Sequence, residues 1–336
     1  MSASFQAFRL FDEDGAVRGR VVSTTIDELS SGDVVIKAAY SGVNYKDALA
    51  GTGTGKIVRR FPLIAGVDVS GTVESSTDAR FRPGDEVLVT GYDLGVAHDG
   101  GYAGRVRVPA DWVVRLPKGL TLFEAMAIGT AGFTAALSVV DMERNGLAPA
   151  DGPVIVTGAT GGVGSVAVQI LAARGYQVTA LTGKDGEHTY LRSLGAKDIL
   201  SRNGLDRGSR PLEKAIWAGA VDVVGGDTLA WLTKTMRYNG CIAASGLTGG
   251  THLQTTVLPF ILRGVKLLGI DSVMCPMETR LEVWRRLGTD LKPSALKTIA
   301  REIGLKALPD AFATLLKAGA RGRFVVALES RDVEMA

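Results

Sequence analysis

Hydrophobic and polar positions follow two different patterns in the two parts of this chain. Up to about residue 120, short Val-rich stretches alternate partly between apolar and polar positions, and Gly, Pro, Asp or Ser bounds each stretch. This alternation between turn residues predicts β-strands. The predicted strands span residues 33–43, 66–73, 85–91 and 104–117. The pattern is typical of a small barrel or sandwich.

Beyond this region the pattern changes to helical periods and continuous apolar runs. Residues 120–142 predict a helix, with Thr121 as its N-cap and Glu124 at the capping-box position. From there, strands are predicted at 153–159, 176–183, 198–202, 220–226, 241–246 and 265–273, with helices at 161–175, 187–196, 210–219, 228–240 and 256–264. Apolar strands that alternate with amphipathic helices predict a parallel sheet covered on both faces.

The last predicted strand of the chain shows the same Val-rich pattern as the strands predicted in the first 120 residues. Three helical stretches, 279–291, 295–303 and 309–318, precede a last predicted strand at 322–329. A chain of 336 residues is long enough for two domains. We therefore predict an α/β protein with a β-rich domain over residues 1–125, which the tail from about residue 300 to 336 joins, and a doubly wound parallel-sheet domain over 126–299.

Composition and charge exclude several classes of protein. Hydrophobic residues make up 46% and charged residues 22%, and the net charge of +3 comes from Lys and Arg scattered among similar numbers of acids. This argues against a nucleic-acid partner. Two cysteines without a C-x-x-C motif and three separated histidines exclude a disulfide framework and a Cys-rich zinc site. With no signal-peptide pattern and no long apolar window, we expect a cytoplasmic protein without a membrane partner.

The stretch "VTGATGGVG" carries the clearest chemistry. Gly158, Gly161 and Gly164 form G-x-x-G-x-x-G between an apolar strand and a helix, and Gly162 lies between them. Without Cβ atoms the backbone can approach a pyrophosphate, and the first turn of a helix offers unpaired N–H groups. We predict a dinucleotide cradle; the alternative is a tight glycine-rich turn with no ligand.

The end of the next strand indicates which dinucleotide binds. Thr182, Gly183 and Lys184 end that strand, and Arg202 ends the strand after it. Small polar and basic side chains suit a 2′-phosphate, so we predict NADPH. Asp185 is the counter-indication, because an acid in this region would bind the ribose 2′-hydroxyl of NAD. The alternative for Lys184 and Arg202 is solvated loop charge.

No metal is expected in the first domain. Medium-chain alcohol dehydrogenases carry zinc beside a Gly-His-Glu segment, and Gly66-Val67-Asp68 stands at the matching place here. Val67 cannot ligate zinc, and no clustered His or Cys replaces it.

Several strings resemble the zinc-free branch of the medium-chain dehydrogenase/reductase superfamily: "NYKDAL", "FPLIAGVDVSG", "RPGDEVLVTG", "GGYAGRVRVP", "GTAGFTA" and "GATGGVG". Three longer strings, "NYKDALAGTGTGKIVRRFP", "RPLEKAIWAGAVDVVGG" and "TVLPFILRGVKLLGIDSVM", are similar to the YhdH/AcuI family of NADPH-dependent acryloyl-CoA reductases. The resemblance covers essentially the whole chain. It implies a GroES-like catalytic domain, a Rossmann NADPH-binding domain and a homodimer.

The resemblance also implies site residues. The segment of Asn44, Tyr45 and Asp47 would line the cleft at the nicotinamide: Tyr45 as nicotinamide contact or proton relay, Asn44 as donor to a thioester carbonyl, Asp47 as an orienting group. The alternative is that these are packed turn residues. Further cofactor contacts are expected from Thr160, Gly161, Gly162, Val163, Gly164, Leu247, Ser272 and Arg323. Lys56, Arg59 and Arg60 are candidates for the phosphates of coenzyme A, or form a solvated basic loop.

The predicted reaction is NADPH-dependent reduction of the C=C bond of a short α,β-unsaturated acyl-CoA, acryloyl-CoA to propionyl-CoA, without a metal. Such a substrate is already polarised, so the protein needs only to position the partners, stabilise an enolate-like oxygen and supply a proton. Two alternatives stay open: an NADPH:quinone or enone oxidoreductase, and a structural or RNA-binding protein that still holds NADPH.

Overall fold

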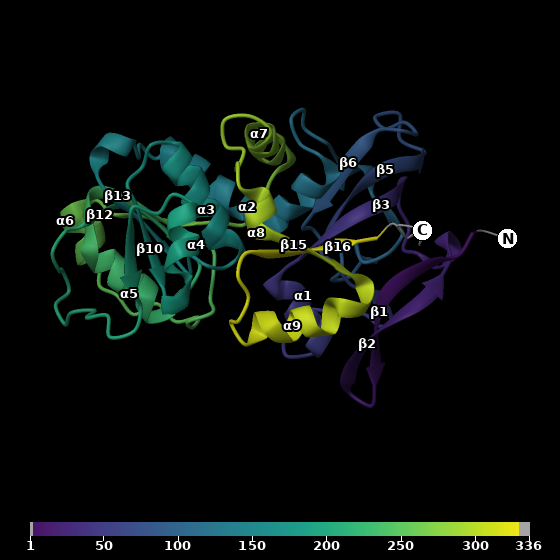
Figure 1. The fold of residues 1–336 in the computed structure, drawn as a ribbon, viewed down its shortest axis with the longest axis horizontal. Helices are drawn as coiled ribbons and strands as arrows, with labels where there is room; N and C mark the ends of the chain where they lie inside the picture. The colour runs from purple at the N-terminus through teal and green to yellow at the C-terminus, as the bar shows by residue number, and fades with distance from the viewer. Residues whose placement is uncertain (1–2, 329–336) are drawn as a thin grey trace. The chain divides into compact units, whose positions relative to one another are not determined.

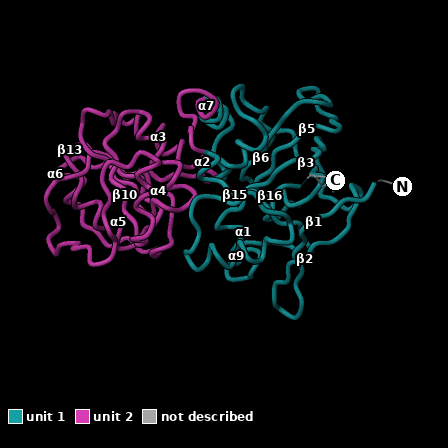
Figure 2. The backbone as a smooth tube through the Cα atoms, in the orientation of Figure 1, with its two compact units in different colours: residues 1–130, 273–285, 296–336 teal, residues 131–272, 286–295 magenta. Residues whose placement is uncertain are grey.

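The computed structural model describes residues 3–328, which fall into two compact units (Figure 2). Unit 1 comprises residues 1–130, 273–285 and 296–336, and unit 2 comprises residues 131–272 and 286–295. The described segments 3–130 and 296–328 therefore both belong to unit 1, and the middle of the chain forms most of unit 2.

Unit 1 contains two sheets among its described residues. The hairpin of β1 (Phe5–Glu13) and β2 (Ala16–Thr24) is antiparallel, and β4 (Leu63–Ile64) pairs with β1. The larger, seven-stranded sheet has the order β15-β16-β3-β5-β6-β8, and β7 also pairs with β3. Its strands are β3 (Val34–Val43), β5 (Asp68–Ser76), β6 (Glu86–Thr90), β7 (Arg105–Val108), β8 (Val114–Arg115), β15 (Ala300–Gly304) and β16 (Arg323–Ala327).

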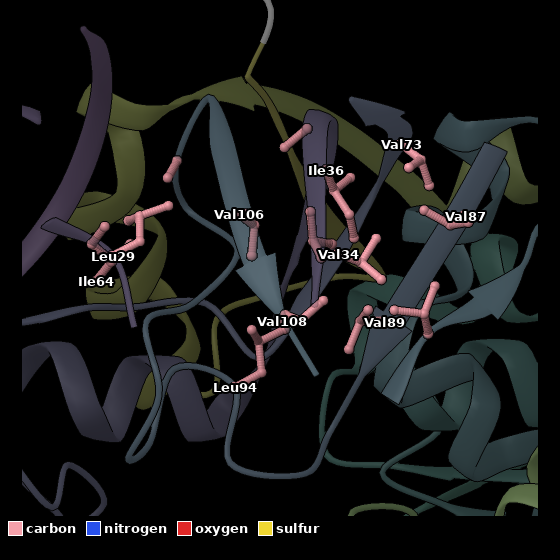
Figure 3. Packing of buried hydrophobic residues seen from close by; sticks show 14 of the residues in the cluster. Leu29, Val34, Ile36, Ile64, Val73, Val87, Val89, Leu94, Val106 and Val108 are labelled. Atoms are coloured by element: carbon pink, nitrogen blue, oxygen red, sulfur yellow. The ribbon is translucent and has the colours of Figure 1, made fainter. Parts of the chain in front are cut away.

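The period-two pattern of the sequence is what builds the core of unit 1. Alternate residues of β3, β6 and β7 point to one side and pack with Leu29, Ile64 and Leu94, as Figure 3 shows. Val34, Ile36, Val87, Val89 and Val108 are not exposed at all. Burying one such side chain contributes roughly 1.5–3 kcal/mol, so this cluster is a main source of the unit's stability.

In the described part of unit 1 lie four helices, wholly or mainly: α1 (Tyr45–Thr52), α7 (Met277–Leu287), α8 (Leu296–Ile299) and α9 (Leu308–Leu316). A second core joins β1 to α9, where the rings of Phe8 and Phe312 meet edge to face at 5.9 Å. Gly51 lets α1 lie against the Phe312 ring, which a Cβ at this position would overlap. In α7, the enclosed Arg280 donates to the Thr90 carbonyl at 2.7 Å and fixes this helix to β6.

Unit 2 contains a parallel sheet, six-stranded within the described part of the chain, in the order β11-β10-β9-β12-β13-β14. Figure 1 labels β10, β12 and β13 of this sheet. The strands are β9 (Val154–Thr157), β10 (Val178–Thr182), β11 (Asp198–Ser201), β12 (Trp217–Asp222), β13 (Met236–Ala244) and β14 (Lys266–Gly269). The helices that follow them are α3 (Gly162–Ala173), α4 (His188–Ser193), α5 (Gly226–Thr235) and α6 (Leu258–Arg263). Short 3-10 turns span Ile26–Glu28, Ala110–Trp112, Pro149–Asp151, Asp185–Glu187 and Leu305–Ala307.

The long helix α2 (Leu122–Arg144) is interrupted at Gly129, where φ is 51° and ψ is −162°. The helix predicted over residues 120–142 is therefore present, but the prediction missed its interruption at Gly129. By length and composition α2 could cross a membrane, yet 83% of its most apolar window is buried in the protein. We conclude that α2 is the core helix of a soluble protein.

Several further predictions of secondary structure are wrong, among them three helices. Residues 210–219 form no helix, and Trp217 begins the buried strand β12 instead. The predicted helices 228–240 and 295–303 each end early, because β13 begins at Met236 and β15 at Ala300. In each case a helical pattern continues into residues that pair with a neighbouring strand, and the ladder outweighs the weak local propensity. The hairpin of β1 and β2 and the helix α1 were not predicted.

Candidate active site

The glycine loop of unit 2 has the geometry of a cradle. Gly158 has a φ of +56°, and its carbonyl accepts the Gly161 N–H at 2.9 Å. A Cβ on Gly164 would overlap that same carbonyl, so the loop can only close over a glycine. Helix α3 begins at Gly162, and the first-turn N–H groups of Gly162, Val163 and Gly164 have no acceptor within the helix. These residues fit a pyrophosphate, which needs several such donors at once.

Asp222, which was not among the residues predicted from the sequence, joins the glycine loop after β9 to the loop after β12. Its carboxylate is fully buried at the end of β12, accepts the Thr157 hydroxyl at 2.6 Å and accepts the Gly225 N–H at 2.8 Å. Burial raises the pKa of Asp222, and these hydrogen bonds oppose the rise. The loops after β9 and β12 are thereby fixed to each other. An acid inside an otherwise apolar strand was the signal available in the sequence.

Basic groups surround the end of β10. The Arg202 N–H donates to the Thr182 carbonyl at 2.7 Å, and the Arg202 guanidinium lies so close to Gly183 that a Cβ there would be 2.8 Å from Nη2. Lys184 is half-buried, and burial lowers its pKa while Glu187 raises it. The carboxylate of Asp185 accepts the Ser201 hydroxyl at 3.1 Å. The Arg202 guanidinium thus lies at Gly183, the residue before Lys184; the role of both side chains toward a 2′-phosphate stays a prediction.

The remaining predicted residues of unit 2 lie at different depths. Thr160 is buried and Val163 half-buried in the glycine loop, whereas Leu247 is 57% exposed after β13. Ser272 is buried, and its hydroxyl accepts that of Thr134 at 2.8 Å. Thr134 is a contact that the sequence gave no reason to expect, because 138 positions separate the two residues.

In unit 1, Asn44 and Asp47 begin α1. Asp47 stands at the third helical position, where its Oδ2 accepts the Asn44 N–H at 2.8 Å and its Oδ1 accepts the Val67 N–H at 3.0 Å. Only 1% of Asp47 is exposed. Burial, and then the charge of Asp68, raises the pKa of Asp47 to about 7, although the two backbone donors and Tyr102 oppose the rise. Asp47 therefore sets the start of α1.

The side chain of Asn44 is hydrogen-bonded to both members of a buried ion pair. Its Nδ2 donates to Asp68 Oδ2 at 2.8 Å, and its Oδ1 accepts from Arg323 Nη1 at 2.7 Å. Arg323 Nη2 lies 3.5 Å from Asp68 Oδ2, with the two side chains 2% and 0% exposed. Burial lowers the pKa of Arg323, and Asp68 opposes this. The predicted cofactor contact Arg323 is thus enclosed within unit 1.

Two glycines make room for this pair. A Cβ on Gly42 would stand 2.6 Å from both Arg323 Nη2 and Asp68 Oδ2, and a Cβ on Gly129 would overlap the same two atoms. The interruption of α2 at Gly129 also frees the Thr130 N–H, which donates to Asp68 at 3.0 Å, while the Thr130 hydroxyl donates at 2.5 Å. Asp68 is therefore the group around which this end of unit 1 is arranged.

Tyr45 and the basic loop lie outside the buried cluster. Tyr45, the first residue of α1, is 38% exposed. Lys56 is exposed, Arg59 pairs with Asp93 at 3.3 Å, and Arg60 is bound to Asp99 at 3.0 Å and to the Ala97 carbonyl at 2.8 Å. The guanidinium of Arg60 is thus already engaged within the protein. Roles for these residues toward a substrate stay predictions.

The matching place of a zinc site is occupied by protein contacts. The Asp68 carboxylate accepts from Asn44 and Thr130 and faces the guanidinium of Arg323. Among residues 3–328, no three or more His, Cys, Asp or Glu side chains are grouped so as to hold a metal ion.

The fold and the glycine loop define a class, the two-part medium-chain dehydrogenases/reductases. Residues 30–118 match the alcohol dehydrogenase GroES-like domain family, and residues 162–288 match the zinc-binding dehydrogenase family. The predicted fold, a GroES-like part plus a Rossmann-type parallel sheet, is confirmed.

Full-length relatives narrow the class. The chain is 52% identical over 98% of its length to the putative quinone oxidoreductase YhfP of Bacillus subtilis, which it covers completely. A crystal structure of YhfP with NAD bound has a TM-score of 0.95, at 51% identity over 97% of this chain and 100% of that one. The acrylyl-CoA reductase AcuI of Ruegeria pomeroyi is 49% identical over 94% of this chain and 96% of its own length. The YhdH oxidoreductase of Salmonella enterica in complex with NADP is 50% identical, with a TM-score of 0.94 over 96% of this chain and 100% of that one.

These similarities extend over both units and confirm the resemblance stated from the sequence. The chain belongs to the YhdH/AcuI family of medium-chain oxidoreductases.

Proposed function

We propose that the protein reduces the C=C bond of a short α,β-unsaturated acyl-CoA with NADPH, converting acryloyl-CoA to propionyl-CoA. The observation that carries this proposal is the 49% identity to the Ruegeria pomeroyi acrylyl-CoA reductase over nearly the full length of both chains. The oxidoreductase class itself follows from family membership; the substrate is the proposal.

The residues of unit 2 support NADPH as the cofactor. The first turn of α3 would hold the pyrophosphate, and Lys184 and Arg202 around Gly183 would hold the 2′-phosphate. A charge-assisted bond of this kind contributes about 1.5–3 kcal/mol. Asp185, which could favour NAD, has its carboxylate turned to Ser201. The NADP-bound YhdH structure agrees with this choice, whereas the NAD-bound YhfP structure makes the direct comparison of both nucleotides necessary.

NADPH, when bound, supplies a hydride for the β-carbon of the acyl group. Negative charge then develops on the thioester oxygen, and the α-carbon takes up a proton. The protein has to stabilise that oxygen with a donor and deliver that proton. Asn44 offers a carboxamide N–H for the first task, and Tyr45, with an exposed hydroxyl-bearing side chain at the start of α1, suits the second. Asp47 fixes the helix start that carries both.

The alternative substrate is a quinone or enone, which the name of the equally similar YhfP favours. Oxidation of NADPH by the purified protein should be measured with acryloyl-CoA and with a benzoquinone at equal concentrations, and the acyl product identified by mass spectrometry. We expect a higher kcat/KM for acryloyl-CoA and stoichiometric propionyl-CoA. A clear preference for the quinone would replace the proposed substrate with the alternative.

We further propose that the enzyme is a cytoplasmic homodimer. Strand β14 stands at the edge of the described sheet of unit 2, and near it Tyr238, Val257, Ile261 and Leu262 are exposed by 54–71%. An unpaired edge with apolar neighbours suits a second copy of the chain. Cys241 and Cys275 are both buried free thiols, as suits a reducing compartment. Light scattering should give twice the chain mass for the native protein and the monomer mass for Ile261→Asp; a monomeric native protein would refute the dimer.

A further inference from the structure

The carboxamide of Asn44 is held in a single orientation by two opposite charges. Its nitrogen donates to the Asp68 carboxylate at 2.8 Å and its oxygen accepts from the Arg323 guanidinium at 2.7 Å. A carboxamide that rotated by half a turn would present its oxygen to the carboxylate and its nitrogen to the guanidinium, and both bonds would become repulsive. The ion pair thus decides which end of Asn44 faces which way.

The ion pair itself is held by further hydrogen bonds and is buried. Arg323 Nη1 also donates to the Val43 carbonyl at 3.1 Å, and the Thr130 N–H donates to Asp68 at 3.0 Å. A Cβ at either Gly42 or Gly129 would overlap these two side chains. Arg323 is 3% and Asp68 0% exposed, so water does not compete for these bonds.

Stability alone gives little reason for such a pair. Removing two charges from water costs several kcal/mol for each ion, and an apolar pair of similar volume is often equally stable or more stable. Here the pair additionally demands two glycines and an interrupted helix. The arrangement is therefore better explained by what it positions than by what it stabilises.

What it positions is an N–H with no partner in the protein. The Asn44 nitrogen carries two hydrogens, and within residues 3–328 only one has an acceptor, Asp68. The Arg323 bond to the amide oxygen draws electron density from the nitrogen, which strengthens the remaining N–H as a donor. Asn44 as a whole keeps 8% of its surface exposed.

We propose that Asp68 and Arg323 are positioning residues that lock the carboxamide of Asn44 so that its second N–H donates to the carbonyl oxygen of the unsaturated substrate. This inference rests on the proposed function and adds the residues that determine how Asn44 works. It also assigns Arg323 a place behind Asn44 rather than a contact with the cofactor, since its guanidinium is enclosed within unit 1.

The test is a double-mutant cycle on turnover. Asp68→Asn and Arg323→Lys are each made in the native chain and in the Asn44→Ala chain, and kcat, KM for NADPH and the melting temperature are measured for all. A residue that acts through Asn44 has no further effect once Asn44 is gone. We expect each change to lower kcat at least tenfold in the native chain and less than about twofold in the Asn44→Ala chain, with KM for NADPH changed by less than about threefold.

Opposite outcomes overturn the inference. Equal falls in kcat in both backgrounds would mean that the pair acts on the fold and not through Asn44. A large rise in KM for NADPH with unchanged kcat in Arg323→Lys would make Arg323 a cofactor contact. Where Asp68→Asn fails to fold, Thr130→Val, which deletes one donor to Asp68, takes its place in the cycle. Arg105→Lys, in the partly exposed pair with Glu74, is the matched control and should leave all three quantities unchanged.

Two arms separate this inference from the substrate assignment. A native protein that turns over quinone but not acryloyl-CoA refutes the proposed substrate, and the same cycle is then run with quinone. A crystal structure of Asp68→Asn provides a readout that needs no turnover. We expect the Asn44 carboxamide to rotate away from its position beside residue 68; an unmoved carboxamide would show that Asp68 does not orient it.

Discussion

The carboxylate of Asp47 makes the stability of this protein depend on pH in an unusual direction. Asp47 is enclosed among Asp68, Tyr102 and Arg323, and burial and the charge of Asp68 raise its pKa from 3.8 to about 7. The folded chain therefore binds this proton more tightly than the unfolded chain does. A raised pKa contributes stability that is complete below 3.8 and is lost as the pH rises through about 7.

The magnitude follows from the two pKa values. One pKa unit corresponds to about 1.4 kcal/mol, so the full difference is about 4 kcal/mol, of which about 2 to 3 kcal/mol falls between pH ~5 and ~8. Asp47→Asn removes this titration and keeps the shape. The amide must turn its NH₂ toward either the Asn44 or the Val67 N–H, which costs roughly 1–3 kcal/mol at every pH.

The assay is urea unfolding of the native protein and of Asp47→Asn at several pH values over this range. We expect the native protein to lose about 2 to 3 kcal/mol relative to the variant as the pH rises from ~5 to ~8. Asp14→Asn, at the exposed turn between β1 and β2, is the control and should follow the native protein. A difference between native and Asp47→Asn that stays constant, or that grows with pH, would refute the buried protonated acid.

Three other expectations concern the packing around Asp68, the predicted 2′-phosphate site and the start of α1. Gly129→Ala should lower the free energy of unfolding by roughly 2–5 kcal/mol in urea unfolding, because its φ of 51° and ψ of −162° are strained for alanine and its Cβ would overlap the ion pair; an unchanged stability would contradict the packing around Asp68. Lys184→Ala should raise KM for NADPH about tenfold and leave KM for NADH nearly unchanged in steady-state assays; equal effects on both nucleotides would mean that Lys184 does not reach a 2′-phosphate. Tyr45→Phe should lower kcat more than it weakens NADPH binding, measured by fluorescence titration, and unchanged turnover would exclude Tyr45 as the proton route.

Sequence patterns were sufficient for features that depend on neighbouring residues. The strand, glycine loop and helix around Gly158–Gly164 are formed by consecutive residues. The motif predicts that Gly164 must lack a Cβ, and in the structure a Cβ there would overlap the Gly158 carbonyl. The segment Asn44–Asp47 was also singled out from the sequence, because its residues are consecutive, but the helix α1 that begins there was not predicted. The parallel sheet followed from apolar runs that could be counted along the chain.

Long-range pairing explains most of what the patterns missed. The helical pattern continues past Met236, but Met236 and then Cys241–Ala244 pair with β12, and Ala300–Gly304 pairs with β16. Backbone hydrogen bonds to a distant strand outweigh propensities of less than about 1 kcal/mol per residue. The interruption of α2 has the same origin, since it serves an acid that lies 62 positions earlier in the chain.

By itself, the sequence determined the class of the protein and the two parts of its fold, and it located the glycine loop and named candidate side chains for the site. Only the tertiary structure brought Asp68 and Arg323 together, from positions 255 apart in the chain, and showed that Asn44 is held between them. The physical reason is that a buried charge requires partners from whatever segment surrounds it, and which segments meet there is decided by the packing of strands and not by any local pattern.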